Sequence, residues 1–120
     1  MLGDKTTNPV EAIVARQLDA YHRQNVDEFV ACFAPDVVIV TEGSDTQLLG
    51  RENMRTQYAA MFQKFPNNKC TLLSRVVVGD HAVDEELIDG RNEAPFRVAV
   101  VYTIKAGLIA HVRFLSRETV

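Results

Sequence analysis

The sequence predicts one α+β domain, with short helices packed in the concave face of a strongly curved, mixed but mostly antiparallel sheet. Three observations predict this class. Helical periodicity dominates the first half of the chain, β-branched runs dominate the second half, and short stretches of turn residues separate those runs. Helices followed by a strand meander are typical of α+β domains whose helices cover one sheet face. Such a sheet encloses a cone, whose open end would admit a ligand.

The first helix is expected to begin at Pro9, because Asn8 is a favourable N-cap and Glu11 can reach back toward it. Its buried face repeats at intervals of three and four residues. That face comprises Val10, Ile13, Val14, Gln17, Leu18 and Tyr21. Gln17 is the polar member of an otherwise apolar stripe.

Two further helices are expected. Asn25 caps the second, which we expect to run until Pro35 ends it. A third opens at residues 49–52 and stops at Pro66, with apolar residues at helical spacing between them. These three helices form the layer inside the cone.

Strands account for the rest of the chain. Residues 37–41 are a β-branched run, followed by a polar loop over 42–47. Later runs are separated by short turns, which indicate antiparallel hairpins. These runs are 71–78, 82–88, 96–104 and 108–117.

Length and charge restrict the class of protein. A chain of 120 residues fits one domain, expected over 9–118 after a flexible segment at 1–8. The net charge of −3, without a basic cluster, argues against nucleic acid as a partner. No apolar run suits a membrane span and no leader pattern precedes the first helix, so we expect a cytoplasmic protein that does not bind membranes.

No metal site and no cofactor are expected. Cys32 and Cys70 lie far apart in the sequence and read as buried, reduced thiols. The histidines do not cluster at the spacing of metal ligands. The glycine-containing segments are hairpin turns and not phosphate-binding loops.

Two motifs resemble the NTF2-like superfamily, which has a cone-shaped, cystatin-like fold. The first is Phe-Ala-Pro-Asp-Val at 33–37, and the second is Leu-Gly-Arg-Glu at 49–52, followed by Tyr58. The turn at 107–109 agrees with them. Within the superfamily the chain is most similar to SnoaL-like and ketosteroid-isomerase-like proteins, over essentially residues 9–118.

The resemblance implies a fold more firmly than an activity, because such proteins include isomerases, polyketide cyclases, dehydratases, epoxide hydrolases and binding modules. Ketosteroid isomerases use an acidic proton shuttle, a tyrosine and a protonated aspartate. The first two positions fall here on Thr41 and Gln17, and the third falls near Val100. None carries the required side chain, so the triad is absent, although a supporting tyrosine matches at Tyr58.

Glu42 is the candidate general base from the residues themselves. It ends the first predicted strand at the open end of the cone, where a carboxylate against apolar walls would have a raised pKa. The alternative is that Glu42 is the first solvated loop residue, with Thr41 pointing inward. Gln17, Tyr21, Thr41 and Tyr58 would form a neutral pocket for a small, mostly apolar molecule carrying one carbonyl or hydroxyl group.

Arg75, Asp84 and Glu86 lie on adjacent predicted strands, with both acids on the same side. If that side is concave, Arg75 and Glu86 form a buried ion pair lining the pocket; if convex, the three residues form a rim or interface. On the last strand, Phe114 is expected to face the core. His111 would then face away from it.

Three hypotheses follow. The first is a cofactor-independent isomerase, cyclase or dehydratase acting on a hydrophobic carbonyl compound. The second is a non-catalytic ligand-binding module, and the third is a domain whose main role is association. In all three, we expect a homodimer that covers a large apolar surface on the outer face of the sheet. That face carries Val98 and Val100, or else the residues that alternate with them along the strand.

Overall fold

The structure, a computed structural model, describes residues 8–120 and confirms the α+β class. Residues 1–7 of the segment expected to be flexible lie outside the described residues. The helices are α1 (Pro9–His22), α2 (Val26–Val30) and α3 (Arg51–Lys64). The strands are β1 (Phe33–Thr41), β2 (Gln47–Leu49), β3 (Lys69–Val78), β4 (His81–Asp89), β5 (Phe96–Lys105) and β6 (Leu108–Thr119).

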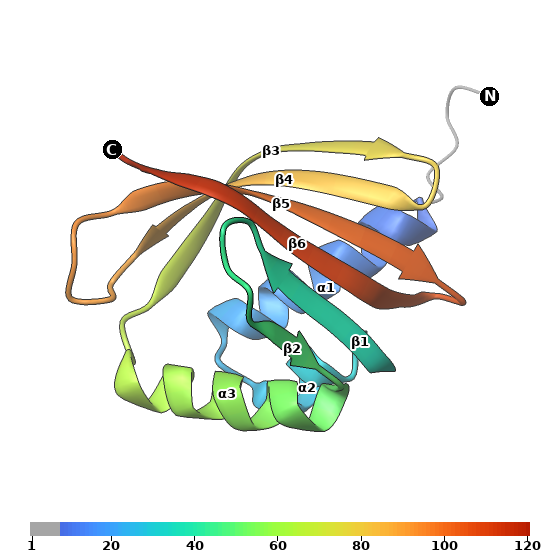
Figure 1. Cartoon of the computed structure of the whole chain (residues 1–120), viewed down its shortest axis with the longest axis horizontal. Coiled ribbons are helices and arrows are strands. Elements are labelled where there is room, and N and C mark those ends of the chain that lie inside the picture. Colours follow the sequence, from blue (N-terminus) through green and yellow to red (C-terminus); the bar gives the residue numbers. More distant parts are fainter. Residues whose placement is uncertain (1–7) are drawn as a thin grey trace.

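One curved six-stranded sheet, ordered β2-β1-β6-β5-β4-β3, forms the framework. Strands β1 and β6 pair in parallel, and the other neighbours are antiparallel. Figure 1 shows the sheet curling over the three helices, with α1 beneath the long β3–β6 strands and α3 near β1 and β2. The space between the helices and the concave face holds the core.

The helix starts follow the capping chemistry of the sequence. The Asn8 side chain accepts a hydrogen bond of 2.8 Å from the backbone N–H of Val10, with Pro9 in the first turn. Asn25 accepts one of 3.1 Å from the N–H of Glu28 at the start of α2. These caps fix where α1 and α2 enter the cone.

The expected extent of the second helix is wrong. Helix α2 ends at Val30, and β1 already begins at Phe33, so Pro35 lies inside the strand. The pairing of β1 with β6 shifts register between Phe33 and Val38. Proline is tolerated at such an irregularity because no ladder hydrogen bond from its nitrogen is required there. Strand β2, within and just after the expected loop, was also missed.

Strand alternation separates the two faces of the sheet. On β5, Val98, Val100 and Tyr102 are buried against the helices, so Ala99 and Val101 face outward. The outer face therefore carries Ala99 and Val101, the residues that alternate with Val98 and Val100 along the strand. On β6, Val112 is buried on the concave side, which leaves His111 on the opposite side.

Candidate functional site

A small inner cavity of about 50 Å³ lies between α1, α3 and the concave face. Its walls are mostly aromatic and aliphatic, and its polar lining side chains come from different elements. These polar residues are Gln17, Tyr21, Tyr58, Cys70, Glu86 and Tyr102. The space suits a few water molecules or one polar end of a ligand.

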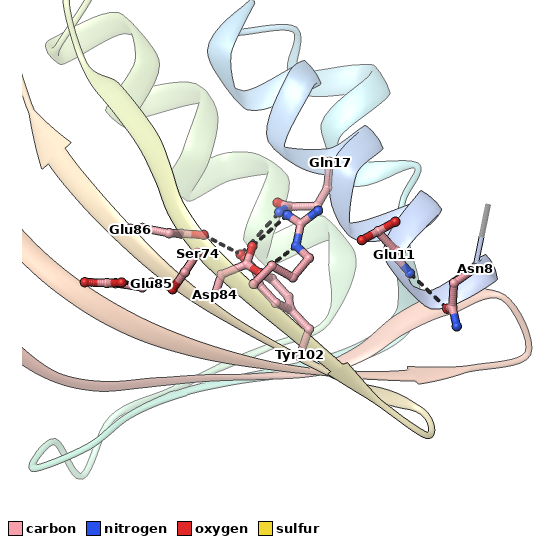
Figure 2. Close-up of polar contacts among 9 residues, drawn as sticks. Asn8, Glu11, Gln17, Ser74, Asp84, Glu85, Glu86 and Tyr102 are labelled. Atoms are coloured by element: carbon pink, nitrogen blue, oxygen red, sulfur yellow. Dashed lines mark hydrogen bonds and ion pairs between the residues drawn. The ribbon is translucent and has the colours of Figure 1, made fainter. Parts of the chain in front are cut away.

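Glu86 on β4 supplies the carboxyl group of this cavity. The residue is 4% exposed, and one carboxylate oxygen accepts a 3.2 Å hydrogen bond from the Tyr102 hydroxyl. That hydroxyl in turn accepts a 3.2 Å hydrogen bond from the Gln17 amide. Figure 2 shows Gln17, Glu86 and Tyr102 converging between α1 and the sheet, with Glu85 directed away.

Burial raises the pKa of Glu86 to about 7. Loss of hydration is the largest cause, and the nearby charge of Asp84 raises the pKa further. Hydrogen bonds from Cys70 and Tyr102 partly oppose this effect. A carboxyl group with this pKa is available as both acid and base near neutral pH.

The buried ion pair joins Arg75 to Asp84, and the predicted pairing of Arg75 with Glu86 is wrong. The contact is bidentate, at 2.7 Å from Nε to Oδ1 and 2.8 Å from Nη2 to Oδ2. Asp84 is directly opposite Arg75 in the β3–β4 register. Within residues 8–120, Glu86 therefore has no ion-pair partner, and Arg75 does not line the inner cavity.

A second, wider pocket of about 670 Å³ lies beside the inner cavity and opens to solvent. Ile39, Tyr58 and Phe114 line both spaces. These three side chains therefore lie between the outer pocket and the cavity that Glu86 lines. Tyr58 makes no hydrogen bond to any residue within 8–120, and burial raises its pKa, so its hydroxyl stays protonated.

Glu42 lies at the rim of this outer pocket. Its side chain is 44% exposed, accepts a hydrogen bond from Ser116, and lies 4.0 Å from Arg113. Thr41 lines the same pocket. The described structure thus encloses the carboxyl group of Glu86 and leaves that of Glu42 in contact with water.

The structure brings together most, but not all, of the residues singled out in the sequence. Among them, the inner cavity is lined by Gln17, Tyr21, Tyr58, Glu86 and Phe114. Tyr102 and Cys70 were not predicted to line the pocket, and Cys70 was expected only as a buried thiol. Both face Glu86 because they lie on the two strands that flank β4, a relation that requires the strand order.

Arg91 is a further functional candidate that the sequence did not single out. It lies in the β4–β5 connection, where its Nε donates to Asn68 at 2.9 Å and its Nη2 to the Tyr21 hydroxyl at 2.8 Å. Tyr21 lines the inner cavity, whereas Arg91 lines the outer pocket. The Arg91–Tyr21 contact therefore links the two spaces.

Among residues 8–120, no three His, Cys, Asp or Glu side chains group closely enough to hold a metal ion. None of the helices in that range is both long and apolar enough to cross a lipid bilayer.

The chain belongs to the SnoaL-like domain family, whose sequence profile matches residues 14–112. No curated protein matches it by sequence. The fold is that of NTF2-like, or cystatin-like, proteins, as expected from the motifs around residues 33–37 and 49–52.

Solved structures show the same fold at low identity. An uncharacterised cystatin-fold protein from Novosphingobium aromaticivorans is 23% identical, with a TM-score of 0.83, over 92% of this chain and 100% of that one. A protein from Kribbella flavida, provisionally assigned as a ketosteroid isomerase, is 18% identical, with a TM-score of 0.81, over 93% of this chain and 80% of that one.

A protein from Jannaschia, provisionally assigned as a SnoaL-like polyketide cyclase, is 15% identical, with a TM-score of 0.79, over 97% of this chain and 92% of that one. At these identities the similarity shows the fold alone. The chemistry of this chain depends on its own side chains.

Proposed function

We propose that this protein binds a small, mostly apolar carbonyl compound and that Glu86 transfers a proton to and from it without a cofactor. The supporting observation is an enclosed carboxyl group with a pKa of about 7 and no ion-pair partner within residues 8–120. Such a group is suited to general acid–base chemistry at neutral pH. The reaction would be of the isomerase, cyclase or dehydratase type.

For an isomerisation, the carboxylate of Glu86 removes a proton from the carbon beside the ligand carbonyl. The C–H electron pair forms the enolate double bond, and the negative charge moves to the carbonyl oxygen. A protonated tyrosine hydroxyl then stabilises that oxygen, and Tyr58 fits this role because it lines both spaces. Return of the proton to another carbon of the ligand completes the reaction.

Proton exchange of a hydrophobic ketone tests this proposal. We would incubate the protein with 2-tetralone in D₂O and follow deuterium uptake at the carbons beside the carbonyl by NMR. Wild-type protein is expected to accelerate uptake, and the rate should rise with pH and level off above about 7, as Glu86 loses its proton.

The matched variants are Glu86→Gln and Glu42→Gln, which each remove one carboxylate. The acceleration should disappear in Glu86→Gln and persist in Glu42→Gln, whose side chain is 44% exposed. The opposite result would place the base at Glu42. Unchanged exchange in both variants would contradict acid–base catalysis by either carboxylate.

A non-catalytic binding module is the second candidate. Val100, fully buried, lies near the position that resembles the acid position of ketosteroid isomerases, and among residues 8–120 Glu86 is the one acidic residue that lines the inner cavity. Such a module would bind 2-tetralone without accelerating deuterium uptake. Binding without exchange in the wild-type protein would therefore favour this candidate.

We also propose that the protein associates as a homodimer through its outer sheet face. Val76, Val83 and Val101 lie side by side on three adjacent strands of that face, and Val76 is 59% exposed. A second copy would remove this apolar row from water. Sedimentation at micromolar concentration should show a dimer for the wild type and a monomer for Val76→Glu; a wild-type monomer would contradict the proposal.

A further inference from the structure

We infer that the ligand of the outer pocket is an anion, a hydrophobic carboxylic acid whose carboxylate is held by Arg91. This inference rests on the proposed ligand-binding role of the pocket and adds the charge of the ligand. The proposed proton transfer by Glu86 does not by itself require a charged ligand.

The charge of Arg91 lacks an acidic partner. No carboxylate of residues 8–120 lies within 4.0 Å of its guanidinium, although the group is half-buried. Its two hydrogen bonds go to neutral side chains, Asn68 and Tyr21. A guanidinium has five N–H donors in a planar fork, so donors remain for a carboxylate.

The position of Arg91 is fixed by its surroundings. The preceding residue, Gly90, has a φ of +84°, and a Cβ there would lie 2.1 Å from the backbone oxygen of Asn67. This close approach holds the β4–β5 connection against the turn that precedes β3. Together with the bonds to Asn68 and Tyr21, it preorganises the guanidinium before a ligand arrives.

The pocket in front of Arg91 suits a molecule with an apolar body. Tyr58, Met61, Val98 and Phe114 form apolar parts of its lining. A carboxylate at Arg91 would place such a body against these side chains, with its far end directed toward the inner cavity through Tyr58 and Phe114. The ligand class is therefore an amphiphilic acid.

The other charged groups of the outer pocket are already paired. Arg117 lies 3.4 Å from Glu93 and 4.2 Å above the Phe96 ring. Glu42, at the rim, interacts with Ser116 and Arg113. Arg91 lies 5.9 Å from the centre of the same Phe96 ring and is thus the charged lining residue that has no oppositely charged partner within residues 8–120.

A pair of uncharged and charged probes tests this inference by calorimetry. We would compare 2-naphthoate with 2-naphthamide, which has a similar shape and no charge. Wild-type protein should bind 2-naphthoate about tenfold more tightly, the lower range for a hydrogen bond to a charged group. In Arg91→Met this preference should disappear, so that 2-naphthoate and 2-naphthamide bind with about equal affinity.

The control is Arg117→Met, which removes a positive charge from the same pocket and should retain the preference. The ratio of the two affinities does not depend on the fraction of folded protein, so it stays informative if Arg91→Met is less stable. An NMR shift of the Arg91 side-chain N–H on addition of 2-naphthoate would report the contact directly.

The failures of the two proposals are distinguishable. Equal affinities in the wild type, or a preference unchanged in Arg91→Met, would overturn the anion inference and leave deuterium exchange of neutral 2-tetralone by Glu86 unaffected. Failure of both naphthalene probes to bind would overturn the inference together with ligand binding in this pocket.

Discussion

Replacing Glu86 with glutamine should change the stability of the protein in a way that depends on pH. Burial moves the pKa of this carboxyl group from 4.5 to about 7 in the folded protein. Because the side chain is only 4% exposed, solvent screens this effect little. The difference corresponds to about 3 kcal/mol between the protonated and charged forms.

The sign follows from proton binding. Between pH 4.5 and about 7 the folded protein holds the Glu86 proton more firmly than the unfolded chain does. The contribution of Glu86 to the free energy of unfolding must therefore fall as pH rises through this range and level off above it. Glutamine does not titrate, so the Glu86→Gln variant should lack this fall.

Urea unfolding of both proteins from pH 4.5 to 8.5, at constant ionic strength, measures the effect. Stability of Glu86→Gln relative to the wild type should increase by about 3 kcal/mol across this range. The control is Glu85→Gln, which removes an outward-facing carboxylate that pairs with Arg97 at 3.1 Å. Parallel pH curves for the wild type and Glu86→Gln would refute the reasoning.

Two further predictions concern the framework of the site. Asp84→Asn should lower the free energy of unfolding by about 3–5 kcal/mol because it leaves the guanidinium of Arg75 buried without its charged partner; urea unfolding checks this, and a loss below 1 kcal/mol would contradict it. Gly90→Ala should lower the free energy of unfolding more than Gly107→Ala does. At Gly107 the positive φ alone opposes alanine, by about 1–2 kcal/mol, whereas at Gly90 the added Cβ also meets the backbone oxygen of Asn67. Equal losses of stability in thermal unfolding would contradict this second prediction.

The helix starts and the turns were predictable because their causes are local. Asn8 and Asn25 cap the helices by bonds to backbone groups two or three residues away. The end of α2 was not predictable from Pro35, because a shift in pairing with β6, distant in sequence, admits proline into β1. The three residues of β2 are too few to show strand periodicity.

The ion pair of Arg75 with Asp84 could have been assigned from the sequence by counting residues outward from the hairpin turn. Gly79 and Asp80 form the hairpin turn, so Val78 faces His81 and the register then places Arg75 opposite Asp84. Counting fails beyond Ser74, because an irregularity between Leu72 and Ser74 shifts the pairing. The enclosure of Glu86 depends on that part of the sheet.

The role inferred for Arg91 depends on long-range packing. Its partners, Tyr21 and Asn68, are 70 and 23 residues away in the sequence. Nothing in the residues around Gly90 predicts that their connection packs against Asn67. Contacts of this kind depend on the tertiary arrangement and leave no periodic signal.

The most direct test of the proposed site is the titration of Glu86 itself. The side-chain carboxyl ¹³C resonance, assigned by comparison with Glu86→Gln, can be followed by NMR from pH 4 to 9. We predict a midpoint of about 7, as expected for an enclosed carboxyl group that serves as acid and base near neutral pH. A midpoint near 4.5 would show that water reaches this carboxylate freely and would contradict the proposed function.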